Sequence, residues 1–135
     1  MRYLPLAIAI ALLLPPALVR AATPSWQPAT ATMVSGGIAS KSTFVIQAYV
    51  TLPQACDAAR IRTESISSQL HRSFIVEQLP PSSPCTGAIY KCTVVSPAYH
   101  LPLQQPFEVH SKGKTWEVHL AMEPPNPTPP SCRKS

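Results

Sequence analysis

The segment Thr43–Leu52 reads TFVIQAYVTL and alternates with a period of two residues. One of its two faces is mixed, because Val45 and Tyr49 stand among its polar residues, and we expect that face to be partly covered. Period two with β-branched and aromatic residues predicts a β-strand, which Pro53 ends. The face expected to point into the core is entirely apolar: Phe44, Ile46, Ala48, Val50 and Leu52.

Other segments have similar strand features and are separated by turns rich in proline. None longer than a turn shows the 3.6-residue period of a helix. Six or seven short strands over about 100 residues predict an all-β fold, an immunoglobulin-like antiparallel β-sandwich spanning residues 43–121. The further strands are expected over residues 60–66, 73–79, 88–95, 107–110 and 115–120, with a short edge segment within 99–106.

The last two of these strands form a hairpin around Ser-Lys-Gly-Lys. Its connection pairs Val109 with Trp116 and Phe107 with Val118, which places the large apolar side chains on one face. We therefore expect Trp116 to be a core residue.

The two ends of the chain differ from the expected domain. Residues 1–21 have the order of a secretory signal peptide: a charged start, an apolar run over residues 4–14, and small residues before a cut after Ala21. The run is shorter than the roughly 20 residues that span a bilayer, so we expect no membrane span after cleavage. Residues 22–42 are expected to be an N-terminal arm with a possible edge strand, and residues 122–135 an extended proline-rich tail.

Composition argues against two broad functions. The chain has 11 basic and 6 acidic residues, a net charge of +5. Because the basic residues are scattered, they predict no nucleic-acid stripe. Asp57 and Asn126 are the sole aspartate and asparagine, which leaves little material for an active site. We expect no enzymatic activity, no catalytic residues and no cofactor.

One cluster on the hairpin is a candidate metal site. In the expected register Glu108 lies directly opposite Glu117, and His119 is a diagonal neighbour of Glu108. Two carboxylates and an imidazole are suitable ligands for zinc or copper. The simpler interpretation, which we favour, is a solvated face that protects a sheet edge from aggregation. The Ser111-x-x-Lys114 spacing, typical of penicillin-binding enzymes, falls in a turn and carries no such chemistry.

The four cysteines predict two disulfides. Cys56, Cys85, Cys92 and Cys132 remain after the expected cleavage, and none forms the close Cys-x-x-Cys pair of a zinc site. Their positions alone allow three pairings.

Three stretches resemble a loose group of small exported bacterial domains with immunoglobulin-like sandwiches. They are residues 44–52 running into Pro53-Gln54-Ala55-Cys56, then Pro84-Cys85-Thr86, and the hairpin around residues 112–114. In such domains a cysteine after an early strand pairs with one in the loop before a later strand, which implies Cys56–Cys85. The chain departs from that layout in having Cys92 and Cys132, which would form the second bridge and hold the tail. Most of these domains have no established activity, so the resemblance implies a fold.

With catalysis set aside, binding remains as the expected function. We predict an exported, non-enzymatic protein-binding domain of the periplasm or extracellular space, of inhibitor, immunity or adaptor type. It would act as a monomer on another exported or envelope protein, and no sequence motif indicates the binding residues. Proline-rich loops over residues 80–84 and 97–106 would lose little entropy on contact. The alternative is a structural or accessory envelope protein without a discrete ligand.

Overall fold

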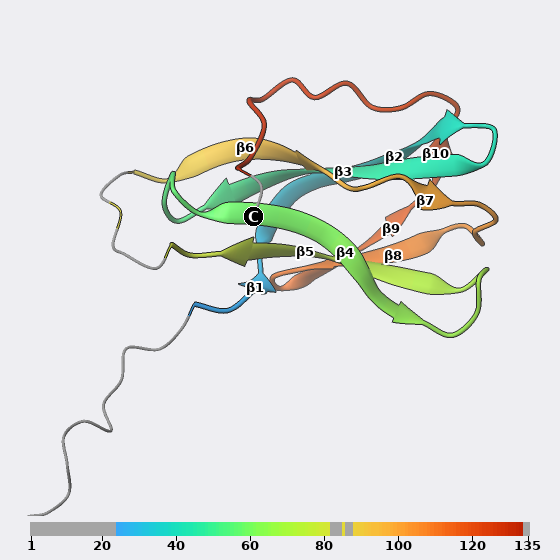
Figure 1. The fold of residues 1–135 in the computed structure, drawn as a ribbon, viewed down its shortest axis with the longest axis horizontal. Helices are drawn as coiled ribbons and strands as arrows, with labels where there is room; N and C mark the ends of the chain where they lie inside the picture. Colours follow the sequence, from blue (N-terminus) through green and yellow to red (C-terminus); the bar gives the residue numbers. More distant parts are fainter. Residues whose placement is uncertain (1–23, 82–84, 86–87, 134–135) are drawn as a thin grey trace, which may run out of the picture.

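The computed structural model describes residues 24–81, 85 and 88–133, so the expected signal peptide lies outside it. The described residues form ten strands and no helix, arranged as two facing sheets (Figure 1). Seven of these strands have five or more residues. The all-β sandwich predicted from the sequence is confirmed.

The edge strands of the first sheet are β4 and β9. The short β1 (Gln27–Pro28) lies beside the end of β5. Pairing is antiparallel except between β5 and β8, which run parallel. Across the sheet the order is β4 (Ala58–Ile66), β5 (Arg72–Leu79), β8 (Phe107–Ser111) and β9 (Lys114–Val118).

The second sheet is built around the strand that the sequence pattern singled out. The short β7 (Tyr99–His100) pairs with the start of β3, and β10 runs parallel to β2. The alternation in β3 is confirmed, since its five apolar residues on the inner face are at most 1% exposed. Across the sheet the order is β10 (Leu120–Ala121), β2 (Thr30–Ser40), β3 (Thr43–Leu52) and β6 (Tyr90–Val95).

Three local expectations need correction. Residues 22–42 were expected to be an arm with a possible edge strand, but they contain the long strand β2, which begins at Thr30 and pairs with β3 along almost its whole length. The hairpin strand expected to continue to Leu120 ends at Val118, and the chain then crosses to the other sheet. Trp116 is only half-buried: Lys114 Nζ lies 3.7 Å from its ring centroid, and its Nε1 donates to Ser111 Oγ at 3.0 Å.

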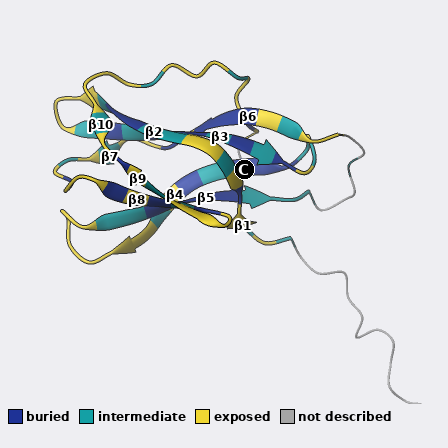
Figure 2. Ribbon diagram, turned by 180° about the vertical axis from the view of Figure 1, so that it is seen from behind, coloured by how far each residue is buried: buried dark blue, intermediate teal, exposed yellow. Residues whose placement is uncertain are grey.

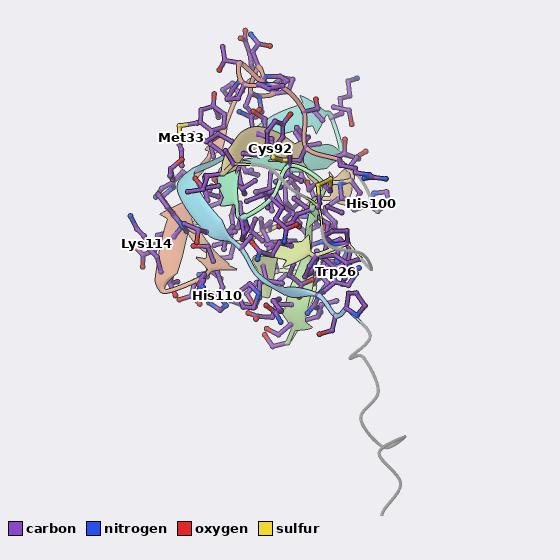
Figure 3. The ribbon with its side chains drawn as sticks, turned by 90° about the vertical axis from the view of Figure 1, so that its left-hand side faces the viewer. Trp26, Met33, Cys92, His100, His110 and Lys114 are labelled. Carbon is purple, nitrogen blue, oxygen red and sulfur yellow. A yellow bond between two sulfur atoms is a disulfide. The ribbon has the colours of Figure 1, made fainter. Side chains whose placement is uncertain are left out.

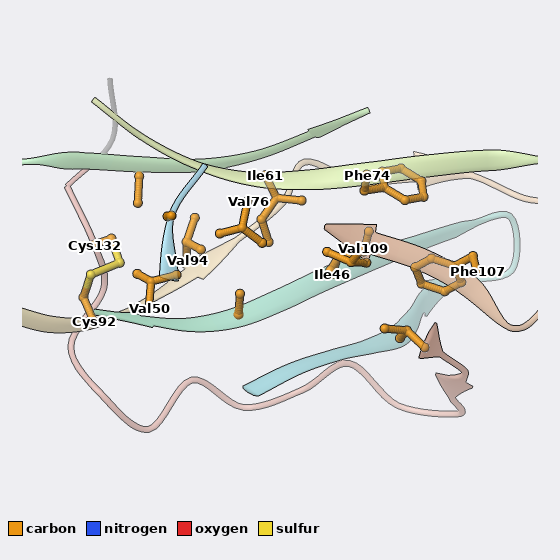
Figure 4. Packing of buried hydrophobic residues seen from close by; sticks show 14 of the residues in the cluster. Ile46, Val50, Ile61, Phe74, Val76, Cys92, Val94, Phe107, Val109 and Cys132 are labelled. Atoms are coloured by element: carbon orange, nitrogen blue, oxygen red, sulfur yellow. A yellow bond between two sulfur atoms is a disulfide. The ribbon is translucent and has the colours of Figure 1, made fainter. Parts of the chain in front are cut away.

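The core between the sheets has two different ends (Figure 4). At one end three phenylalanine rings pack together, with Phe74 5.5 Å from Phe107 and 6.0 Å from Phe44 between centroids. Edge-to-face contacts of this kind add to the stabilisation from burial. At the other end the Cys92–Cys132 disulfide lies beside Val50 and Val94.

The proline-rich tail does not project into solvent. It runs along the outer face of the second sheet and returns to its edge at Cys132 (Figure 1). On the way Thr128 Oγ1 lies 2.7 Å from the hydroxyl of Tyr49. The outer face of β3 is partly covered, as expected, and Gln47 on that face is 1% exposed. Figure 2 shows the tail itself as largely exposed.

Candidate functional site

Both expected disulfides form. Cys56 and Cys85 lie with Cα atoms 6.1 Å apart, and Cys92 and Cys132 with theirs 4.9 Å apart. The Cys56–Cys85 pairing implied by the resemblance and the remaining Cys92–Cys132 pairing are therefore confirmed. Two disulfides indicate an oxidising location outside the cytoplasm.

The candidate metal ligands are only partly brought together. Glu108 faces Glu117 in the hairpin register, as predicted, and Val109 faces Trp116. His119, however, lies beyond the end of β9, where the chain leaves the sheet. Within the described ranges no group of three His, Cys, Asp or Glu side chains is placed to hold a metal ion. All three candidates are exposed.

A different histidine forms the ionic cluster on this face. The ring of His110 in β8 contacts Glu64 Oε1 through Nδ1 and lies 3.3 Å from Glu108 Oε1 through Nε2. Desolvation alone would lower the pKa of His110, but the hydrogen bonds and charges of the two glutamates outweigh it and raise that pKa. Sequence analysis missed this cluster because Glu64 lies 46 residues away, on β4. Figure 3 shows His110 at the surface, well away from Cys92.

The edge strand β4 is held to β5 by a second ionic group. Both Arg60 and Arg62 donate to Glu77, with Nε to Oε1 distances of 3.0 and 2.7 Å, and Arg62 also reaches Oε2 at 3.0 Å. Burial of Glu77 would raise its pKa, yet the two arginines overcome this effect and leave the pKa below its ordinary value. The guanidinium of Arg60 stacks on Trp26, with Arg60 Cζ 3.9 Å from the centroid of the Trp26 ring.

The strand β4 also forms one wall of a groove in the described structure. The groove, of about 690 Å³, separates the edge of β4 from the edge of β6, and we call it the β4–β6 seam. Its volume is within the range of ordinary ligand sites. The seam is lined by residues 59–62 of β4, residues 93–97 in and after β6, and Tyr99, Ser131 and Cys132.

The two strands turn backbone groups towards the seam. The N–H of Ala59 donates to Arg133 O at 3.1 Å, and the N–H of Thr93 donates to Pro130 O at 2.8 Å. In a β-strand the residue two positions further on presents its backbone to the same side. Ile61 on β4 and Val95 on β6 therefore also direct their backbone groups into the seam.

Each end of the seam is closed by the chain itself. At one end Ser131 pairs in parallel with Thr93, and Arg133 pairs in parallel with Ala58, so the tail bridges the two sheets. At the other end the hydroxyl of Tyr99 donates to Ile61 O at 3.3 Å. Among the residues that the structure describes, the groove lies between these two contacts.

Sequence reasoning did not find the seam. The strand expected over residues 60–66 is confirmed as β4. Nothing local shows that the edge of β4 faces the edge of β6, because their residues lie about 30 positions apart along the chain and belong to different sheets.

Comparison with known proteins identifies no relative. No protein-family model, no curated protein and no solved structure matches this chain. Among the described residues no helix is long and apolar enough to cross a membrane.

Proposed function

We propose that the mature chain is an exported, non-enzymatic protein-binding domain that works in the periplasm or extracellular space and binds another exported or envelope protein through the β4–β6 seam. The seam is the observation that carries the proposal, because it combines two facing strand edges with an apolar floor. Proteins recognise extended segments of other proteins at sheet edges through main-chain hydrogen bonds.

The chemistry around the seam supports binding in preference to catalysis. Its charged residues, Arg60 and Arg62, are both engaged with Glu77, and its other lining residues are apolar, hydroxyl-bearing or proline. Such groups orient and hold a polypeptide but supply no nucleophile with an adjacent base.

Two further features fit an exported address. Residues 1–21 have the pattern of a cleaved signal peptide. The disulfides tie the loop before β6 and the C-terminal tail to the body of the domain. An oxidised scaffold held by two disulfides suits an inhibitor, an immunity protein or an adaptor, and we take it to act as a monomer.

Site-specific photo-cross-linking tests the proposal. Val95 is 42% exposed and lines the seam, so a benzoylphenylalanine placed there would contact any segment bound in it. The matched control carries the same group at Thr115, which is exposed on the opposite edge strand, β9. Oxidised protein of both kinds is mixed with envelope and medium fractions of the source cells and irradiated.

We expect a discrete heterologous adduct at Val95 that excess unmodified protein displaces, and none at Thr115. Equal labelling at both positions, or no displaceable adduct at Val95, would show that the seam is not a binding site. That second result would favour a structural envelope protein without a discrete ligand.

A further inference from the structure

The part of the tail that crosses the second sheet has a sequence that favours one backbone conformation. Residues 124–130 read PPNPTPP, and each of them is a proline or comes directly before one. Proline fixes φ near about −65°, and the residue before a proline is kept out of the helical region. The peptide bonds before these prolines are trans, and residues 124–128 belong to no strand or turn. This segment, which we call the proline strap, is therefore a polyproline II helix with three residues per turn.

The strap is fixed to the domain at both ends. Before it β10 pairs with β2, and after it the Cys92–Cys132 disulfide joins the chain to β6. Between these points Thr128 Oγ1 lies 2.7 Å from the hydroxyl of Tyr49 on β3. A stiff segment held in this way has already lost conformational freedom that a free peptide would lose on binding.

The three-residue period divides the prolines of the strap into two sets. Pro124, Pro127 and Pro130 are three positions apart, so their rings lie along one ridge, and all three are exposed. Pro125 and Pro129 fall between them and are half-buried. The strap therefore presents a ridge of exposed proline rings that are spaced by roughly 9 Å, the length of one turn of a polyproline II helix.

The main chain of the strap also offers hydrogen-bond acceptors. Among the described residues, none donates a hydrogen bond to the carbonyl oxygens of residues 124–128. The carbonyls of Pro129 and Pro130, by contrast, accept from the hydroxyl and the N–H of Thr93. A polyproline II helix makes no internal hydrogen bonds. The carbonyls beside the exposed ridge can therefore accept from a donor on another molecule.

We propose that the exposed ridge of the proline strap is a second interaction surface of this protein, outside the β4–β6 seam, and that it binds a folded domain with a groove lined by tryptophan and tyrosine side chains. Polyproline II segments dock in aromatic-lined grooves, where the rings pack on one another. An indole N–H or a phenol hydroxyl in such a groove can donate to the carbonyls of the strap. Because residues 124–130 carry no charge, recognition depends on ring packing and main-chain hydrogen bonds.

A second copy of this chain does not offer a groove of this kind. Its two tryptophans lie apart, one directly before β1 and the other on β9. Each already has a cationic side chain over its ring: Arg60 Cζ lies 3.9 Å from the Trp26 centroid, and Lys114 Nζ lies 3.7 Å from the Trp116 centroid. The partner is therefore a different protein.

Photo-cross-linking at the strap tests the proposal with the oxidised mature protein. Benzoylphenylalanine replaces Asn126, which is exposed and adjoins the ridge, and the matched control carries the same group at Thr115 on β9. Both proteins are irradiated with envelope and medium fractions of the source cells. The competing probes are acetyl-PPNPTPP-amide, acetyl-APNATPA-amide, which lacks the three ridge prolines, and acetyl-PANPTAP-amide, which lacks the two half-buried ones.

We expect a discrete adduct at Asn126, absent at Thr115, whose cross-linked peptide from the partner contains tryptophan or tyrosine. The first and third probes should displace it, and the probe without ridge prolines should not. In the protein, Pro127→Ala should weaken binding about tenfold, since it removes two methylene groups from the ridge. Pro125→Ala is the same change off the ridge and should have little effect. A strap that only holds the tail in place predicts the reverse order, because Pro125 is the half-buried residue.

Three results would overturn the proposal: no displaceable adduct at Asn126, equal labelling at Thr115, or equal weakening by the two proline variants. These results are independent of the proposed function, which depends on the adduct at Val95. If Val95 is labelled and Asn126 is not, the strap is not a binding surface and the proposed function stands. If Asn126 is labelled and Val95 is not, the seam is not the binding site and the strap proposal stands.

Discussion

The two sides of the sandwich are closed in different ways. On the side formed by β9, β10 and β2, the chain passes directly from one sheet to the other. On the side formed by β4 and β6, the two sheets are bridged by the C-terminal tail. On the first side Leu120 and Ala121 pair with Gly36 and Gly37 immediately after β9 ends. On the second side residues 131–133 reach both edges only after the tail has crossed the second sheet.

This difference is the reason for placing the proposed binding at the β4–β6 side. At Gly36 an added Cβ would lie 2.9 Å from Leu120 Cδ2 and 3.4 Å from Val118 Cγ1, so the closed side is densely packed. At the β4–β6 side a groove of about 690 Å³ remains beside the tail. Exposed strand edges are usually protected in native proteins. Here the protection is partial, and the unprotected part is the candidate site.

The largest effect is expected from removing the Cys92–Cys132 disulfide, which holds the tail at the β4–β6 side. Replacing Cys92 and Cys132 together by alanine opens a loop with a sequence separation of 40 residues. We expect the free energy of unfolding to fall by about 3–4 kcal/mol, because the unfolded chain gains entropy. Chemical denaturation measures the loss, and hydrogen exchange at the amide of Thr93 reports whether the tail has detached. Unchanged stability with a protected Thr93 amide would contradict the role assigned to the disulfide.

The second prediction compares two adjacent glycines of β2. A Cβ at Gly37 would overlap the carbonyl oxygen of Glu123 and lie 2.9 Å from Pro124 Cα, which are both in the backbone of the tail. Gly37→Ala should therefore destabilise the domain by about 1–3 kcal/mol. Gly36→Ala meets a side chain that can rotate, and should cost less. Thermal unfolding of the pair checks this order, and an equal loss in both would show that the tail is not held tightly where it begins.

The third prediction concerns the ionic support of the β4 edge. Glu77→Gln leaves Arg60 and Arg62 without their carboxylate, and we expect a loss of about 1–2 kcal/mol at neutral pH, since solvent screens the half-exposed arginines. The folded pKa of Glu77 is lowered, so its contribution is present above the ordinary value of 4.5 and is lost as pH falls through the folded pKa. Denaturation between pH 7 and pH 2 should show a weaker acid-side decline in Glu77→Gln. A parallel decline in both proteins would refute this.

The smallest expected effect is at His110, which links β8 to Glu64 on β4. Its raised folded pKa means that its contribution is present below about pH 6.5 and is lost as pH rises through the folded pKa. His110→Gln should therefore lower the free energy of unfolding by less than about 1 kcal/mol at pH 6, and should have no effect once the pH is above the folded pKa of His110. His119 and Glu117 are exposed, so the control variants His119→Gln and Glu117→Ala should leave the melting temperature unchanged both at pH 6 and above the folded pKa of His110. A large loss in either control would instead revive the metal site considered at Glu108, Glu117 and His119.

Much of the strand layout followed from local patterns. Thr43–Leu52 was located by its alternation, and the pairing of Val109 with Trp116 followed from the turn between them. These features depend on residues close together along the chain, where period and turn geometry act directly. Trp116 was placed too deep, because the pattern identifies the face of a strand but not how far the other sheet extends over it.

The sequence by itself determined an all-β chain, its main strands, its hairpin register and a set of cysteines suited to an oxidising compartment. Only the tertiary structure decided that Glu64 meets His110, that two arginines share Glu77, and that the tail crosses a sheet to reach Cys92. These contacts join residues far apart in the chain, and the free energy that selects them comes from packing the two sheets together. The β4–β6 seam belongs to this second group, because it exists only where the edges of two separate sheets come to face each other.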